Sequence, residues 1–120
     1  MGWDVEHTDE FGTWFVDLKG ADQDAIRFTV ELLMAQGPNL RFAHSSGISD
    51  SRRSHMRELR IQSEGRPIRV LYAFDPRRSA ILLIGGDKSG DGRFYERMIP
   101  IADELYDVRL EELKQEGFFK

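Results

Sequence analysis

The amino-acid sequence predicts an α+β fold with the element order β-α-α-β-β-β-α, in which a helical hairpin and a C-terminal helix pack on a small, mainly antiparallel sheet. Apolar residues recur at helical spacing near both ends of the chain. Between these ends lie three strand-like runs that are separated by turn-rich segments. The length of 120 residues, 40% of them apolar, suffices for one core and not for two, so we expect a single domain over residues 1–120.

The N-terminal part of the chain is expected to form a short strand and two helices. Residues 3–7 alternate between apolar and polar, which is the period of a half-buried strand. Thr8 is suited to cap a helix over residues 9–18, in which apolar side chains recur at i, i+3, i+4 and i+7. A second helix over residues 21–36 ends at the stop signal Gly37-Pro38.

The middle of the chain is expected to form a loop followed by three strands. Residues 39–54 are rich in serine and show no sustained period, so they predict a loop. The runs 57–62, 68–75 and 80–85 are joined by short turn-rich segments, which is typical of an antiparallel meander. Within the third run, residues 81–84 are apolar on both faces, as expected of a central strand.

The C-terminal part predicts one more helix. A glycine-rich connection spans residues 85–92, and residues 94–113 then have a helical pattern that Pro100 is expected to interrupt or restart. In this arrangement the helices cover one face of the sheet and leave the other partly open, and we expect a ligand or partner to cover the open face.

Composition excludes several kinds of site. The chain has no cysteine, so it has no disulfide, no thiolate metal site and no cysteine nucleophile. No apolar run approaches the roughly 20 residues of a membrane helix. The first ten residues carry acids in place of the basic and apolar pattern of a signal peptide. We therefore expect a cytoplasmic protein without a membrane partner.

The charges are distributed unevenly along the chain. The formal net charge is −4, but residues 41–78 contain nine arginines and only four acidic residues. Arginine is suited to planar, bidentate contact with phosphate and to stacking on bases. The middle segment is therefore the candidate for anion binding, although a solvated sheet edge would carry the same residues.

Three segments of the chain carry a resemblance to a known family. They are Met56-Arg57-Glu58-Leu59-Arg60, Arg69-Val70-Leu71-Tyr72-Ala73-Phe74 and Ile81-Leu82-Leu83-Ile84-Gly85-Gly86-Asp87-Lys88. In this order and spacing they resemble the RelE/ParE superfamily of toxins, in particular the phage-type HigB-like branch of type II toxin–antitoxin systems. The resemblance extends upstream to Trp14 and downstream to Tyr106, and it implies a RelE-like, microbial RNase-like fold.

The resemblance implies an mRNA interferase, which is a ribosome-dependent endoribonuclease that uses no metal or other cofactor and inhibits translation. In such enzymes the ribose 2′-OH attacks the adjacent phosphate. The protein must accept a proton, stabilise the added charge and protonate the leaving 5′ oxygen. The implied partners are the ribosome, mRNA and a cognate antitoxin of the helix-turn-helix kind, and the toxin oligomerises through the antitoxin complex.

The resemblance also implies roles for individual residues. Arg69 matches the family's strand arginine and is expected to stabilise the phosphate. Arg60 matches the arginine of the Leu-Arg pair on the neighbouring strand, and Lys88 matches the basic residue that follows the glycine pair. Tyr95 resembles a tyrosine that some members use for stacking or proton transfer, with Arg93 beside it as a second cation.

The sequence departs from the family where better-known members carry two lysines before the Leu-Arg pair. Met56 and Glu58 occupy these places here, with Arg57 between them, so a lysine-based proton shuttle is not expected. His55 is the nearest candidate for a general base, because its ordinary pKa lies near neutrality, although a single histidine beside a loop is more often a surface residue. Further candidates for contact with RNA are Arg52, Arg53 and Arg57.

Two other functions remain open at this point. A ParE-like, non-enzymatic inhibitor of DNA gyrase shares the fold but lacks the nucleolytic residues, so Arg69, Lys88 and Tyr95 argue against it. A non-catalytic module whose sheet binds a helix of a partner, such as an antitoxin, is the second alternative, because the lysine pair is missing.

Overall fold

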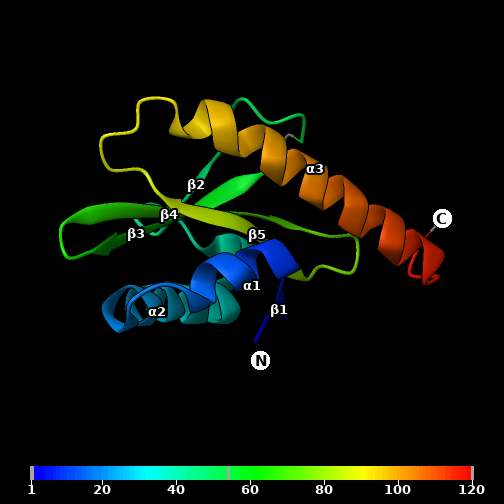
Figure 1. Cartoon of the computed structure of the whole chain (residues 1–120). Helices are drawn as coiled ribbons and strands as arrows, with labels where there is room; N and C mark the ends of the chain where they lie inside the picture. The colour runs from blue at the N-terminus through cyan, green and yellow to red at the C-terminus, as the bar shows by residue number, and fades with distance from the viewer. Residues whose placement is uncertain (1, 54, 120) are drawn as a thin grey trace.

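Helices enclose a sheet from both sides (Figure 1). The computed structural model describes residues 2–53 and 55–119. In chain order its elements are β1 (Val5–His7), α1 (Asp9–Val16), α2 (Gly20–Gln36), the 3₁₀ turn η1 (Gly37–Asn39), β2 (Ser45–Gly47), β3 (Arg57–Ser63), β4 (Arg66–Phe74), β5 (Ala80–Asp87) and α3 (Phe94–Gln115). The α+β class and the predicted order are confirmed, with β2 and η1 as additions.

The strands of the described residues form one five-stranded sheet in the order β1-β5-β4-β3-β2. β3, β4 and β5 form the predicted antiparallel meander, and β1 lies parallel to β5 at one edge. The prediction of a loop throughout residues 39–54 was wrong, because β2 pairs with β3 at the other edge. Its Ser-Ser-Gly sequence has no apolar alternation, and β2 is held by backbone pairing and by side-chain hydrogen bonds of its two serines. Ser54 lies outside the described residues.

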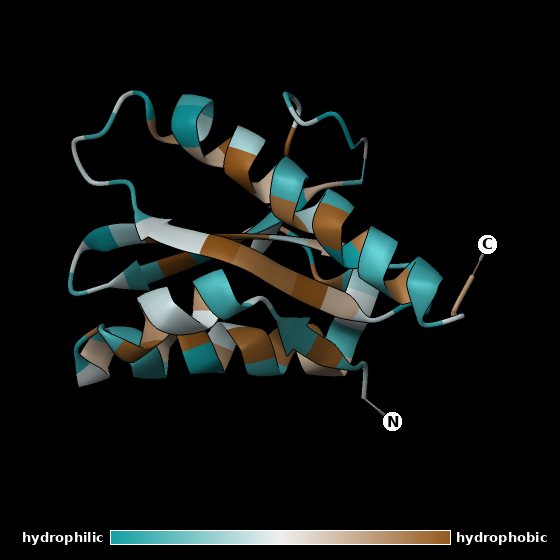
Figure 2. Cartoon of the chain, turned by 45° about the vertical axis from the view of Figure 1, so that its right-hand side comes forward, coloured by the Kyte–Doolittle hydropathy of each residue, from teal (hydrophilic) through white to brown (hydrophobic). Residues whose placement is uncertain are grey.

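The two faces of the sheet carry separate apolar cores. One core lies between the sheet and α1 and α2, and it includes Ile26, Leu33 and Val70. The other lies between the sheet and α3 and includes Leu71 and Leu83. Figure 2 shows apolar strands running between the two helical layers. The expectation that all helices share one face was wrong, because strands that are apolar on both faces require cover on both.

The helix α3 runs without interruption from Phe94 to Gln115, so the predicted break at Pro100 is also wrong. Pro100 is exposed, and its ring therefore points away from the sheet. The backbone hydrogen bond that proline cannot donate is lost on the exposed side of the helix, where the cost of losing it is smallest. The opposite side of α3 buries Met98, Ala102 and Tyr106 against the sheet.

The signals that begin and end the N-terminal helices act as predicted. The Thr8 hydroxyl accepts a hydrogen bond of 3.0 Å from the Phe11 amide and so caps α1. Gly37 ends α2 with a φ of +55°, and a Cβ atom there would lie 2.4 Å from the ring of Trp3. The requirement for glycine is therefore both conformational and steric.

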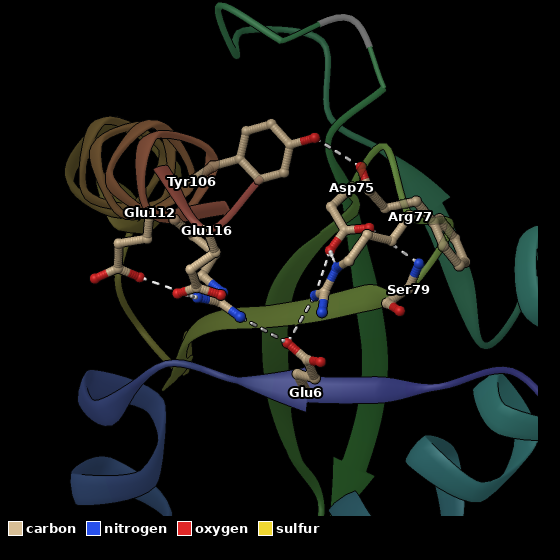
Figure 3. A network of polar contacts seen from close by, with 9 residues as sticks. Glu6, Asp75, Arg77, Ser79, Tyr106, Glu112 and Glu116 are labelled. Atoms are coloured by element: carbon tan, nitrogen blue, oxygen red, sulfur yellow. Dashed lines mark hydrogen bonds and ion pairs between the residues drawn. The ribbon is translucent and has the colours of Figure 1, made fainter. Parts of the chain in front are cut away.

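The C-terminal half of α3 is fixed to the sheet by a network of ion pairs (Figure 3). Arg77, in the turn between β4 and β5, contacts the buried carboxylate of Asp75 and donates to Glu6 of β1 at 2.8 Å. Arg109 of α3 reaches the same Glu6 oxygen at 3.4 Å. Through Glu6, β1 and α3 are thus both attached to the turn between β4 and β5.

A second ion pair joins α2 to the hairpin of β3 and β4. The buried carboxylate of Asp22 accepts hydrogen bonds from the guanidinium of Arg66 and from the Ser63 hydroxyl, the latter at 2.6 Å. Arg66 also donates to Asp87 at 2.9 Å. The hydrogen bonds from Arg66 and, to a smaller extent, from Ser63 hold the pKa of the Asp22 carboxyl below its ordinary value.

We expect Asp22→Asn to lower the free energy of unfolding at neutral pH by about 2 kcal/mol, because a buried hydrogen bond to a charged group is lost. A lowered carboxyl pKa stabilises the fold above the ordinary pKa of about 4, and this contribution disappears as the pH falls through the folded value. The wild type should therefore lose more stability on acidification than the variant. Urea unfolding at several pH values measures this. The exposed Asp24→Asn on the same helix is the control and should unfold like the wild type.

Candidate functional site

A buried carboxylate on β3 is the centre of a cluster of polar side chains. Glu58 is only 4% exposed. One of its oxygens accepts a hydrogen bond of 2.6 Å from the Tyr95 hydroxyl of α3, and the other accepts one of 2.9 Å from the Ser46 hydroxyl of β2. Three elements that lie far apart in the sequence therefore meet at one carboxylate.

Two arginines lie beside Glu58 on the same face of the sheet. Arg60 and Arg69 are directly opposite each other in the pairing of β3 with β4. The Arg60 Nη1 lies 3.3 Å from one oxygen of Glu58, and the Arg69 Nε lies 3.7 Å from the other. Like charges placed opposite each other on a sheet repel, so the carboxylate between them offsets the repulsion.

Arg69 is held by the backbone and is itself nearly buried. Its Nη1 donates to the carbonyl of Ile68 at 3.0 Å and more weakly to that of Ile61 at 3.4 Å. Its buried Nε has no hydrogen-bond partner within the described residues. The distance of 3.7 Å to Glu58 is too long for a hydrogen bond, and a buried N–H without one costs free energy. Arg69 thus has a fixed position and an unused donor.

Lys88 and Tyr95 complete the cluster at the end of β5. The Lys88 Nζ lies 5.5 Å from the centroid of the Tyr95 ring, within the range of a cation–π contact. Burial, followed by the Glu58 carboxylate, raises the pKa of the Tyr95 phenol. The phenol therefore stays protonated and remains a donor. Of the residues that the sequence proposed, the structure brings Arg60, Arg69 and Tyr95 together around Glu58, and Lys88 joins them through the Tyr95 ring.

Glu58 was noted in the sequence only as a replacement for a lysine, and its central position was missed. The signal that could have found it is the strand period, which places residues 58 and 60 on the same face. A single glutamate in a strand carries no other indication of a site.

A pocket reaches two members of the cluster, Glu58 and Tyr95. Its volume is about 250 Å³, and its lining includes Glu58 and Tyr95 together with Gly47 at the end of β2 and Ser49 just after it. It shares Tyr95 and two further residues with a larger depression of about 660 Å³ along α3. A ligand thus has a route to the carboxylate of Glu58.

Three of the proposed residues lie outside this cluster. The His55 Nε2 is 3.1 Å from the hydroxyl of Tyr106, which itself donates to the carbonyl of Phe74. Arg52 and Arg53 both form ion pairs with Asp107 of α3. These contacts attach the segment after β2 to α3, and no contact links the three side chains to Glu58 among the described residues.

The two remaining candidates differ in orientation and in exposure. Arg57 donates to the Ser45 hydroxyl at 3.0 Å, and Ser45 in turn bonds the hydroxyl of Tyr72 in the core beneath α2. Since neighbouring strand residues alternate, Arg57 lies on the opposite face from Glu58. Arg93 is exposed at the start of α3, two residues before Tyr95.

Two further properties of residues 2–53 and 55–119 bear on the kind of site. In these residues no group of three or more His, Asp or Glu side chains is arranged to hold a metal ion. None of their helices is both long and apolar enough to cross a membrane.

Comparison with known proteins places the cluster inside a shared region. The model of the family "Phage derived protein Gp49-like (DUF891)" matches residues 13–107. A protein of Mycobacterium tuberculosis named "Putative toxin HigB3" is 42% identical over 92 residues, which are 76% of this chain and 79% of that protein. A second, "Putative toxin HigB2" of the same organism, is 32% identical over 116 residues, covering 95% of this chain but only 57% of that protein.

Proposed function

The chain belongs to the Gp49-like, phage-derived family, a group of HigB-like toxins in the RelE superfamily, and we propose that it is the toxin of a type II toxin–antitoxin system that cleaves mRNA on the ribosome. The observation that carries this proposal is the buried carboxylate of Glu58 with two arginines at its sides and a pocket in front of it. This set of groups suits a phosphodiester substrate, because it offers both a proton acceptor and cations.

The cluster can supply each proton and charge that the reaction requires. Glu58 accepts the proton of the ribose 2′-OH as the new bond from the 2′ oxygen to phosphorus forms. Arg69 and Arg60 bind the phosphate oxygens, whose negative charge increases in the transition state. The bond from phosphorus to the 5′ oxygen then breaks, and Tyr95 or Lys88 protonates that oxygen. The products are a 2′,3′-cyclic phosphate and a free 5′-hydroxyl.

The carboxylate takes the place of the lysine pair of better-known relatives. A lysine accepts a proton only after it has lost its own, whereas a carboxylate does so directly. The hydrogen bonds from Ser46 and Tyr95 fix the orientation of Glu58. We therefore propose Glu58, in place of His55, as the general base.

The proposed partners follow from the same site. The ribosome holds the mRNA in the decoding site and presents one phosphate, which explains how a chain of net charge −4 can act on RNA without a large basic surface. A cognate antitoxin of the helix-turn-helix kind would cover the site until it is degraded. Such a protein acts in the cytoplasm, where translation takes place.

The proposal is tested by adding the purified chain to a translating extract and mapping the ends of the mRNA by primer extension. We expect cuts within codons that depend on translation. Arg69→Lys keeps the positive charge but loses the planar guanidinium, so its cuts should be at least about tenfold weaker. Intact mRNA would contradict the proposal, and intact mRNA together with inhibited DNA supercoiling would indicate gyrase as the target.

A further inference from the structure

An exposed aromatic ring lies at the edge of the Glu58 cluster. Phe42, in the segment between η1 and β2, is 74% exposed and is the most exposed of the large apolar side chains in the described residues. A phenylalanine exposed to this degree contributes nothing to either core, and it loses the free energy that burial of its ring would provide. Burial in a core therefore does not explain why position 42 is a phenylalanine.

The exposed ring is connected to the cluster through Arg60. The Arg60 guanidinium lies over the ring of Phe42, 4.9 Å from its centroid, and the same guanidinium contacts Glu58 at 3.3 Å. A cation–π contact of this kind orients the ring. The ring is thus coupled directly to a residue that we expect to bind phosphate.

The backbone holds the segment of Phe42 against β3. The Arg60 amide donates to the carbonyl of His44 at 2.9 Å, and the amides of His44 and Ser45 both donate to the carbonyl of Arg41. Phe42 therefore sits in a hydrogen-bonded turn next to the strand that carries Glu58 and Arg60. Its position relative to the cluster is fixed by backbone contacts as well as by the cation–π contact.

The arrangement suits a single-stranded nucleic acid. Proteins bind such strands by placing aromatic rings beside cations, so that a base stacks on the ring while the cation contacts the phosphate. A second pair of the same kind is Lys88 with Tyr95, and the Tyr95 hydroxyl contacts the oxygen of Glu58 that Arg60 does not contact. Each oxygen of the carboxylate thus contacts one member of a pair of an aromatic ring and a cation.

We propose that the ring of Phe42 is a stacking platform for the nucleobase next to the phosphate that Arg60 binds. The inference rests on the proposed function, since it concerns the same RNA. It adds a binding site for one base that accepts any of the four bases, because every base offers an aromatic face.

The test measures the affinity of the chain for a short single-stranded RNA that carries 2′-O-methyl groups and therefore cannot be cleaved. We expect Phe42→Ala to weaken binding by about tenfold and Phe42→Trp to restore it. A series of the same RNA, in which each member lacks the base at one position, locates the stacked base. At one position, loss of the base should weaken binding by the wild type by a similar factor, and it should not change the affinity of Phe42→Ala. Phe118 is 55% exposed, lies beside Arg77 and is far along the chain, so Phe118→Ala is the control and should bind like the wild type.

The outcomes separate this inference from the proposed function. Equal affinity of the wild type and Phe42→Ala for the RNA overturns the inference. It is also overturned if Phe42→Trp does not restore the affinity, or if no abasic RNA weakens wild-type binding to the same extent as Phe42→Ala does. If the wild type cuts mRNA in the translating extract but shows no stacking signature, only the inference fails. If it shows the signature but leaves mRNA intact, the inference stands and the proposed nuclease function fails.

Discussion

Replacing Glu58 with glutamine is expected to abolish mRNA cleavage while the fold is retained. Glutamine keeps the size of the side chain and an oxygen that accepts hydrogen bonds, but it cannot take up the 2′-OH proton. Loss of a general base reduces rates by about 10²- to 10⁴-fold. This reduction is measured as the ratio of the cleavage rates of wild type and variant on ribosomes programmed with a defined mRNA. Thermal unfolding of the variant shows whether the fold is intact.

A matched control separates the role of this carboxylate from that of negative charge in general. Glu111→Gln removes one carboxylate from the exposed end of α3, where the side chain accepts a hydrogen bond from Gln115. It should cleave at the wild-type rate. Wild-type activity in Glu58→Gln would show that the proton acceptor is another group, and His55 would then be the next candidate.

The second large effect concerns stability. Arg69→Met is expected to lower the free energy of unfolding by about 3 kcal/mol, because it leaves the buried Glu58 with less compensating charge. This value is at the low end of the range for breaking a buried ion pair, because Arg60, Ser46 and Tyr95 still contact the carboxylate of Glu58. Unfolding in urea, followed by circular dichroism, measures the change.

The double variant provides the decisive comparison. When Glu58→Gln is added to Arg69→Met, no ionised carboxylate remains beside the methionine, and we expect most of the lost stability to return while cleavage stays absent. If the two stability losses simply add, Arg69 and Glu58 do not interact in the folded protein, and the carboxylate then does not offset the repulsion between Arg60 and Arg69.

Local signals predicted most of the fold. Some signals act through neighbouring residues and can therefore be predicted from the sequence. They are the Thr8 cap, the stop at Gly37 and the alternation of apolar and polar residues in the strands. β2 was missed because Ser45–Gly47 form a strand only through pairing with β3. The continuity of α3 was missed because the cost of Pro100 depends on which side of the helix faces solvent.

The candidate site was predicted only in part, for a similar reason. Arg60 and Arg69 meet because a short turn fixes the register of β3 against β4, and turns of this kind can be read from a sequence. The pairing of Arg52 and Arg53 with Asp107 depends on how a distant helix crosses the sheet, and no local pattern encodes that. The same is true of the contact between Tyr95 and Glu58.

The parallel pairing of β1 with β5 has a consequence for how the protein is made. The Thr8 hydroxyl, directly after β1, donates to the carbonyl of Leu83, 75 residues further along the chain. At typical elongation rates these residues take on the order of ten seconds to synthesise. During that interval the N-terminal strand has no neighbour, and the nascent chain cannot complete its sheet. A newly made molecule therefore acquires its native topology only after β5 has been synthesised.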